Sequence, residues 1–171
     1  LMILGPTMDP AVASKISLRI PHLAMRVAEH AKRAQVFAER LTELGLSVSY
    51  PGLATHPDHE LLNRQRCAEY GFGGILTLDL GTEALASELM DVLQNRYRFG
   101  FMAVSLGYFD TLISNPSSST SSEMTQEDLI AAGIGDGLVR MSVGYTGSIE
   151  QRWRQLESAL HDIGVIEATG R

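Results

Sequence analysis

One row of apolar residues with helical spacing constrains the fold of this 171-residue chain more than any other feature. Recurrence at three and four residues is typical of the apolar face of an amphipathic helix. Pro21 lacks a backbone donor and clashes with the preceding turn, so it predicts a break near Ile20. Gly45 follows, where helices often end on a left-handed residue. We therefore expect residues 9–44 to be helical in two pieces, the second carrying the row Leu23, Val27, Ala31, Ala34, Ala38, Leu41 and Leu44.

Beyond Gly45, strand patterns alternate with helix patterns. The clearest strand places Leu76 and Leu78 on one face and Thr77 and Asp79 on the other, as in a half-buried strand. We expect strands at 46–50, 75–80, 101–106 and 138–143, and helices at 60–67, 83–94, 125–132 and 149–163. This order predicts an α+β fold, a two-layer arrangement of a small, largely antiparallel sheet of about four strands with helices on one face. The serine-rich stretch 114–122 is interpreted as a loop within this domain.

Composition and charge exclude several classes of function. Twenty acidic residues against fourteen basic ones give a net charge of −6, which disfavours binding to nucleic acid or to an anionic membrane. No stretch approaches the roughly 18 apolar residues that span a bilayer. Cys67 is the single cysteine, so neither an internal disulfide nor a thiolate metal cluster is expected. These features predict a soluble, cytoplasmic protein. Because the chain opens on Leu1 within an apolar run, we expect an N-terminal part to precede it.

Two motifs that resemble binding sites are interpreted as turns. His56 and His59 flank Asp58, but a zinc site needs a third and usually a fourth rigid ligand, and spacing supplies none. We therefore predict no metal site. The glycine-rich segment 71–74 precedes a strand, whereas a loop that cradles phosphate follows a strand and opens a helix. His30 lies near the apolar row and is expected to be a hydrogen-bonded packing residue.

Arg140 and Ser105 are the residues whose positions point most directly to chemistry. A period of two puts Arg140 and Ser142 on one face of the last predicted strand. The planar guanidinium matches the geometry of a carboxylate, so Arg140 is a candidate anion ligand. Ser105 ends another predicted strand, where a hydroxyl can lie at the rim of a site. From these residues alone, an arginine on a solvated sheet face is the favoured interpretation.

Several motifs, taken in order, resemble a known family over nearly the whole chain. They are Tyr50-Pro51-Gly52-Leu53, His56-Pro57, His59, Gly73-Gly74, Ala103-Val104-Ser105-Leu106-Gly107, Gly133-Ile134 and Gly137-Leu138-Val139-Arg140-Met141-Ser142-Val143-Gly144. Together they resemble the C-terminal part of the Cys/Met-metabolism family of pyridoxal-phosphate (PLP) enzymes, which includes cystathionine γ-synthase, cystathionine lyases and methionine γ-lyase. Within the family, residues 1–10, 99–107 and 118–123 are most similar to the methionine γ-lyases of plants.

The resemblance implies roles for three residues. Ser105 and Arg140 correspond to the residues that bind the substrate's α-carboxylate, and Thr120 corresponds to one that lines the same site. Ser121 stands where many relatives have a histidine, which leaves details of this loop's role open.

The resemblance also implies what this chain lacks. The lysine that binds PLP covalently, the phosphate ligands and the aromatic ring over the cofactor belong to the family's N-terminal part, and neither Lys15 nor Lys32 lies in a matching motif. We therefore expect no catalytic and no cofactor-binding residue in this chain, and no activity from it alone.

The implied whole enzyme has a defined architecture and reaction. Residues 1–44 would link to an N-terminal cofactor domain, and residues 45–171 would form the C-terminal domain of the fold-type I PLP-dependent transferase fold. The enzyme would take a sulfur amino acid, most simply converting methionine by α,γ-elimination to a thiol, 2-oxobutanoate and ammonia, and would be a homodimer or homotetramer. Two alternatives stay open, a cystathionine γ-lyase or γ-synthase and a non-catalytic binding or assembly module.

Overall fold

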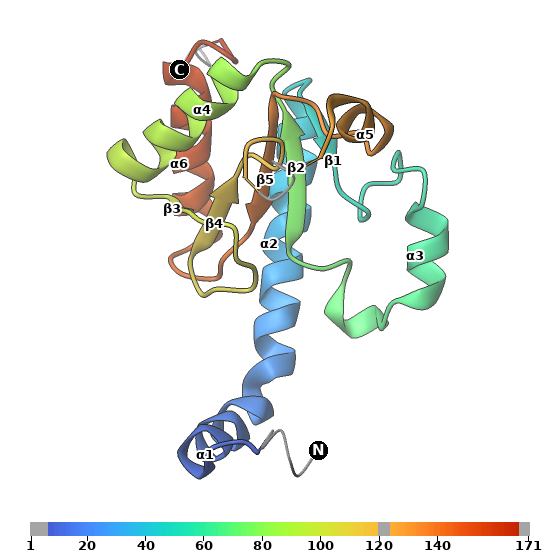
Figure 1. Ribbon diagram of the computed structural model, residues 1–171, viewed down its shortest axis with the longest axis vertical. Helices are drawn as coiled ribbons and strands as arrows, with labels where there is room; N and C mark the ends of the chain where they lie inside the picture. Colours follow the sequence, from blue (N-terminus) through green and yellow to red (C-terminus); the bar gives the residue numbers. More distant parts are fainter. Residues whose placement is uncertain (1–6, 120–123, 168–171) are drawn as a thin grey trace.

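The computed structural model describes residues 7–119 and 124–167. Its helical elements are α1 (Pro10–Arg19), η1 (Ile20–His22), α2 (Leu23–Glu43), α3 (His59–Gln65), η2 (Ala68–Tyr70), α4 (Glu83–Asp91), η3 (Val92–Arg96), α5 (Gln126–Ala131) and α6 (Ile149–Asp162). Its strands are β1 (Ser47–Ser49), β2 (Ile75–Asp79), β3 (Gly100–Met102), β4 (Thr111–Ser114) and β5 (Leu138–Ser142). Figure 1 shows one long arm, formed by α1 and the start of α2, extending from the body that holds the sheet.

The strands form one five-stranded sheet in the order β1-β2-β5-β4-β3. The pairs β1–β2, β2–β5 and β4–β5 are antiparallel, and β3–β4 is parallel. The predicted two-layer, largely antiparallel fold is therefore confirmed, with five strands where about four were expected. The polar face of the sheet is also confirmed, because Thr77 and Arg140 face each other across β2 and β5 while their strand neighbours Leu78 and Val139 are fully buried.

The sequence patterns missed β4 and placed the end of β3 too late. All four residues of β4 are buried, so the strand lacks the polar and apolar alternation that marks a half-exposed strand. The strand predicted at 101–106 ends at Met102. The amide of Ala103 still donates to the Ile113 carbonyl at 3.0 Å, and the residues from Val104 to Phe109 then leave the sheet as an exposed loop.

Helices α2, α4 and α6 bury their apolar faces against one side of this sheet (Figure 1). Phe37 of α2 lies at the centre, with its ring 6.1 Å from the rings of both Phe99 and Trp153, measured between centroids. The fully buried large side chains of this core are Tyr50, Phe37, Phe99, Leu41, Leu76, Leu78, Leu89, Leu93, Ile113, Met141, Leu156 and Leu160. Contacts among three helices and the sheet thus make a single core.

The predicted helix boundaries are confirmed at three places where the signal is local. The break near Ile20 is a three-residue 3₁₀ turn, η1, that contains Pro21. Thr82 caps α4 by accepting from the Leu85 amide at 3.3 Å, and Ser148 caps α6 by accepting from the Gln151 amide at 3.1 Å. The helix predicted at 83–94 is α-helical only to Asp91 and continues as the π-helical turn η3.

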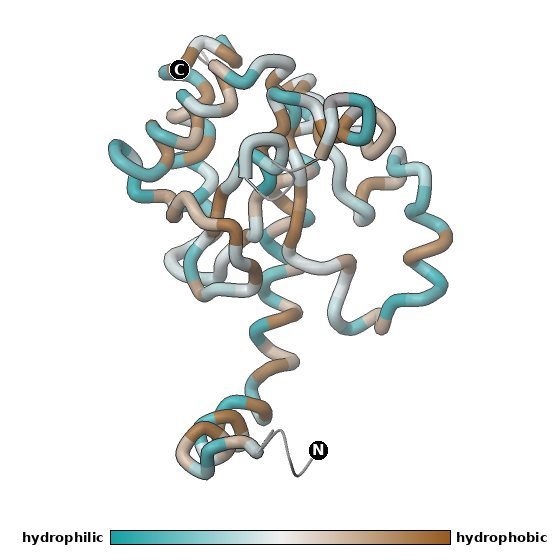
Figure 2. Tube along the Cα trace, viewed as in Figure 1, coloured by the Kyte–Doolittle hydropathy of each residue, from teal (hydrophilic) through white to brown (hydrophobic). Residues whose placement is uncertain are grey.

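The arm formed by α1 and the first half of α2 exposes apolar side chains. Figure 2 shows brown residues along this arm, away from the body. The exposed large residues are Met8, Val12, Ile16, Leu18, Ile20, Leu23, Met25 and Val27, and the first buried residue of α2 is Ala31. Despite this apolar arm, no helix in the described ranges combines the length and hydropathy needed to cross a membrane.

Candidate functional site

Arg140 lies in the middle of β5, on the face of the sheet opposite the core. In the strand register it pairs with Thr77 of β2 and Ser114 of β4. Its side chain is half-buried, and its Nη2 donates to the Val104 carbonyl at 3.1 Å. Within residues 7–119 and 124–167 this is the guanidinium's one hydrogen bond, so other N–H groups are left to bind a ligand.

Ser105 lies in the loop between β3 and β4, defined here as residues 103–110 and called the carboxylate loop. Two hydrogen bonds tie this loop to β5, one from Arg140 to the Val104 carbonyl and one from the Gly107 amide to the Ser142 hydroxyl at 3.0 Å. Arg140 and Ser142 are two residues apart on one strand face, so these bonds hold the chain on either side of Ser105. The structure thus holds the loop that carries Ser105 against β5, the strand of Arg140, and leaves Ser105 exposed.

Thr120, the third expected site residue, lies outside the described residues. The segment that leads to it is folded back on Asn115, which is buried. Asn115 donates to the Asp136 carbonyl at 2.7 Å, and its Oδ1 accepts from the amide and hydroxyl of Ser117. The hydroxyl of Ser119 donates to the Asn115 carbonyl at 2.5 Å. Ser114 belongs to β4, and residues 115–119 form a structured loop within the domain, as predicted for the serine-rich stretch.

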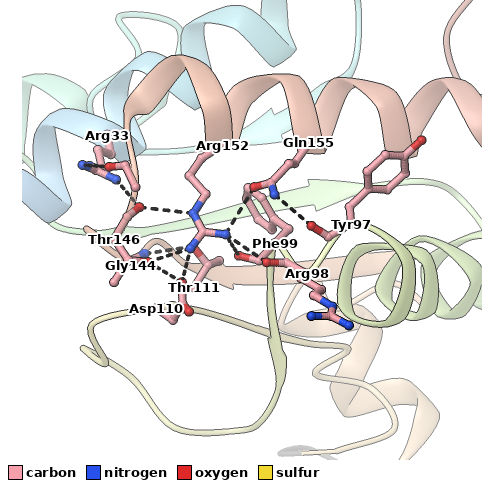
Figure 3. A network of polar contacts seen from close by, with 11 residues as sticks. Arg33, Tyr97, Arg98, Phe99, Asp110, Thr111, Gly144, Thr146, Arg152 and Gln155 are labelled. Carbon is pink, nitrogen blue, oxygen red and sulfur yellow. Dashed lines mark hydrogen bonds and ion pairs between the residues drawn. The ribbon is translucent and has the colours of Figure 1, made fainter.

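Sequence reasoning assigned no role to Ser142, Asp110 or Arg152. Ser142 was placed on the face of Arg140, and its period-two spacing was the signal that could have pointed to a role. Asp110 ends the carboxylate loop and accepts from Arg152 of α6 at 2.8 Å, the contact at the centre of Figure 3. No local sequence pattern predicts this ion pair, because Asp110 and Arg152 are 42 positions apart.

The histidines singled out in the sequence make packing contacts. His30 Nδ1 lies 2.5 Å from the Val143 carbonyl, and its ring meets the edge of Tyr145, which confirms the expected packing role. His59 Nδ1 lies 2.8 Å from the Pro51 carbonyl, and its ring stacks on Phe72. The part of the chain that the structure describes holds no group of three or more His, Cys, Asp or Glu residues that could bind a metal.

Shifted pKa values occur at packing contacts. Burial raises the pKa of Tyr50 to about 12, and its hydroxyl donates to the Gly73 carbonyl at 2.9 Å, just before β2. The hydrogen bond from Tyr97 to Asp162 raises the pKa of the phenol and lowers the pKa of the carboxyl. The hydrogen-bonded ion pair of Arg40 and Glu150 raises the pKa of the first and lowers that of the second. The two side-chain pairs therefore join helical segments to α6, and none of these shifted groups lies at Arg140 or Ser105.

Replacing Gly144 is expected to destabilise the protein, because the backbone at the end of the carboxylate loop lies against this residue. A Cβ at Gly144 would lie 2.4 Å from the carbonyl carbon of Asp110 and 2.6 Å from the oxygen of Phe109. Gly144→Ala should therefore lower the free energy of unfolding by about 1–3 kcal/mol, measured by urea titration. Gly135→Ala is the matched control, because its Cβ would meet only Asp79 Oδ2 at 3.7 Å. Equal midpoints for the two variants would contradict the close approach.

Comparison with known proteins places this site in a family. Residues 2–160 match the family of Cys/Met metabolism PLP-dependent enzymes. The chain belongs to this family. A methionine gamma-lyase of Arabidopsis thaliana is 57% identical to this Cys/Met-metabolism chain over 159 residues, which cover 93% of the chain and 36% of that relative. A cystathionine beta-lyase of Lactococcus lactis is 35% identical, covering 92% of the chain and 40% of that relative.

Solved structures of the Cys/Met-metabolism family have the same fold. A cystathionine gamma synthase of Xanthomonas oryzae, solved with aminoacrylate and cysteine, superposes with a TM-score of 0.74 at 35% identity, covering 84% of this chain and 36% of that one. A putative O-acetylhomoserine (thiol)-lyase of Campylobacter jejuni superposes with a TM-score of 0.82 at 26% identity. The match covers 92% of this chain and 37% of that one. The expected fold-type I C-terminal architecture is confirmed. The family chain described here spans only about two fifths of the length of these relatives.

Proposed function

We propose that this chain is the C-terminal part of a PLP-dependent carbon–sulfur lyase of the methionine γ-lyase type, and that it supplies the residues that bind the substrate's α-carboxylate. One observation carries the proposal. The bonds from Arg140 to Val104 and from Gly107 to Ser142 hold the Ser105 segment over the arginine. The 57% identity to a protein named methionine gamma-lyase supports methionine as the substrate.

Arg140 and Ser105 form a clamp for a carboxylate in this proposal. The planar fork of the arginine donates two parallel hydrogen bonds to the two carboxylate oxygens, and the serine hydroxyl donates a third. Fixing the carboxylate fixes the orientation of the bonds around Cα, which is a positioning contribution to the reaction rate. From the family resemblance, we assign Thr120 to the same carboxylate site.

We propose that no residue of this chain binds PLP. Lys15 and Lys32 are the two lysines of the chain, and both are exposed on helix surfaces of α1 and α2. We therefore assign the cofactor, and the chemistry of the elimination, to another part of the protein. The share of this chain is to bind and orient the amino acid.

The arm fits a role as the connection to that other part. We propose that residues 1–44 link a cofactor-binding domain to a C-terminal domain of residues 45–171, and that the exposed apolar side of α1 and early α2 packs on the cofactor-binding domain. The whole protein would be a cytoplasmic homo-oligomer, a dimer or a tetramer.

Thiol release from methionine tests the proposed division of labour. The full-length protein, supplied with PLP, should release a thiol that a colorimetric thiol reagent detects, whereas the 171-residue chain alone should release none. Borohydride should trap the cofactor on no lysine of this chain. Turnover by the isolated chain with a trapped adduct at Lys15 or Lys32 would contradict the proposal, and Lys15→Arg and Lys32→Arg would identify the lysine responsible.

A cystathionine-processing enzyme is the second candidate. The 35% identities to a cystathionine beta-lyase and to a solved cystathionine gamma synthase favour it. The ratio of kcat/KM for methionine to that for cystathionine separates the two candidates, and a ratio well below one would favour cystathionine. A full-length protein that is inactive on both and also does not synthesise cystathionine would favour a binding or assembly module.

A further inference from the structure

The carboxylate loop makes an unusually short connection between two parallel strands. Gly100 of β3 pairs with Thr111 of β4, and the intervening loop has eight residues, 103–110. Parallel neighbours are normally joined by a dozen or more residues, often including a helix. We expect the backbone conformation of a loop this short to depend on contacts made by the chain that flanks it.

One guanidinium contacts the chain just before each of these two parallel strands. Arg152 of α6 donates through Nη1 to the carbonyls of Arg98 at 2.9 Å and Phe99 at 3.3 Å, just before β3. Through Nη2 it donates to Asp110 Oδ1 at 2.8 Å, just before β4. Figure 3 shows the side chain of Arg152 between these partners.

The same guanidinium is also bonded to the chain that follows β5. Its Nε donates to the Thr146 carbonyl at 3.1 Å, and its Nη2 donates to the Thr146 hydroxyl at 2.7 Å. That hydroxyl donates in turn to Asp110 Oδ1, and the Phe109 carbonyl accepts from the amides of Tyr145 and Thr146. Arg152 therefore connects the carboxylate loop to the strand that carries Arg140.

Burial and backbone geometry indicate that the contacts of Arg152 fix the position of the chain around the loop. The side chains of Arg152 and Asp110 are only 14% and 19% exposed, so their ion pair is screened less than a surface pair. Arg98 is the one non-glycine residue of the described chain with a left-handed φ, at +49°. That conformation is costly, and it directs a carbonyl to Arg152.

We propose that Arg152, acting through Asp110, is a positioning residue for carboxylate recognition. It sets where Ser105 lies relative to Arg140, and it does not itself contact the substrate. This inference rests on the proposed function, because Arg152 and Asp110 would support the same carboxylate site without contacting the substrate.

The test compares arginine variants in the full-length protein. Arg152→Met should raise KM for methionine by about tenfold or more, with a smaller change in kcat, because the charge-assisted bonds to Asp110 and to the chain before β3 are lost. Arg152→Lys should give an intermediate KM, since it can restore the pair with Asp110 but not all the carbonyl contacts. Arg33→Met is the matched control. Arg33 is 6% exposed and donates to the carbonyls of Thr146 and Gly147, but it contacts neither end of the loop.

A double variant separates positioning from stability. Arg152→Met leaves the Asp110 carboxylate unpaired, whereas Asp110→Asn with Arg152→Met removes both charges and should recover part of the lost thermal midpoint. KM should stay raised in this double variant. A wild-type KM in the double variant, or an equal rise in KM in Arg33→Met, would overturn the positioning role.

The same assay distinguishes failure of this inference from failure of the proposed function. If Arg140→Lys raises KM and the Arg152 variants do not, the positioning role alone is wrong. If Arg140→Lys has no effect on the reaction, the carboxylate site is wrong, and the role of Arg152 falls with it.

Discussion

Replacing Arg140 by lysine in the full-length protein is expected to lower kcat/KM for methionine by about 10- to 150-fold, although the positive charge is kept. Lysine offers a mobile point charge where the guanidinium is proposed to make two parallel bonds to the carboxylate. Loss of one charge-assisted hydrogen bond costs about 1.5–3 kcal/mol, which gives this range if the bond persists in the transition state. Steady-state kinetics of thiol release measure the effect.

Controls test whether the effect comes from the carboxylate. Arg154 lies exposed on α6, so Arg154→Lys should leave kcat/KM unchanged. Ser105→Ala removes a neutral donor and should cost less, about 0.5–1.5 kcal/mol, and its effect should not add to that of Arg140→Lys. Competitive inhibition by an amine without a carboxyl group should differ little between the wild type and Arg140→Lys. An unchanged kcat/KM for methionine would show that Arg140 is only a sheet-surface residue.

Phe37→Ala is expected to cause the largest loss of stability, about 3–5 kcal/mol in the free energy of unfolding. The side chain is 1% exposed and joins α2 to Phe99 and Trp153, so its removal leaves a cavity where three elements meet. Trp153 is the single tryptophan of the chain, and its fluorescence during urea unfolding reports directly on this region.

Two variants calibrate this measurement. Phe37→Leu keeps most of the buried volume and should cost clearly less than Phe37→Ala. Val12→Ala changes a residue that is 46% exposed on α1 and should shift the free energy of unfolding by no more than about 0.5 kcal/mol. A loss below about 1 kcal/mol for Phe37→Ala would mean that the core is able to collapse around the cavity.

Much of the fold was predictable because its signals are local. Pro21 breaks the helix through its own ring, and Thr82 and Ser148 cap helices that begin at the next residue. The strand β4 was not predictable in this way. It is buried along its whole length between β3 and β5, so its position depends on partners and not on a period of its own.

In the candidate site, too, the residues with a local motif could be predicted, whereas the long-range contacts could not. Arg140 and Ser105 could be named from motifs, and the structure holds the loop that carries Ser105 against β5. The bonds that hold them there join residues far apart in sequence, 35 positions for Gly107 and Ser142 and 42 for Asp110 and Arg152. Such pairs follow from the packing of α6 and β5, which no local pattern specifies.

Because α2 is long, a small tilt of this helix relative to the sheet moves the far end of the arm by a larger distance. α2 is attached near its middle to the chain that follows β5, through His30 at the Val143 carbonyl and Arg33 at the carbonyls of Thr146 and Gly147. At 1.5 Å per residue, the arm from Arg33 back to Leu23 is about 15 Å long, so a tilt of about 5° moves its far end by about 1 Å. A domain that binds the exposed apolar end of the arm would therefore fix the orientation of α2 relative to the sheet on which it packs.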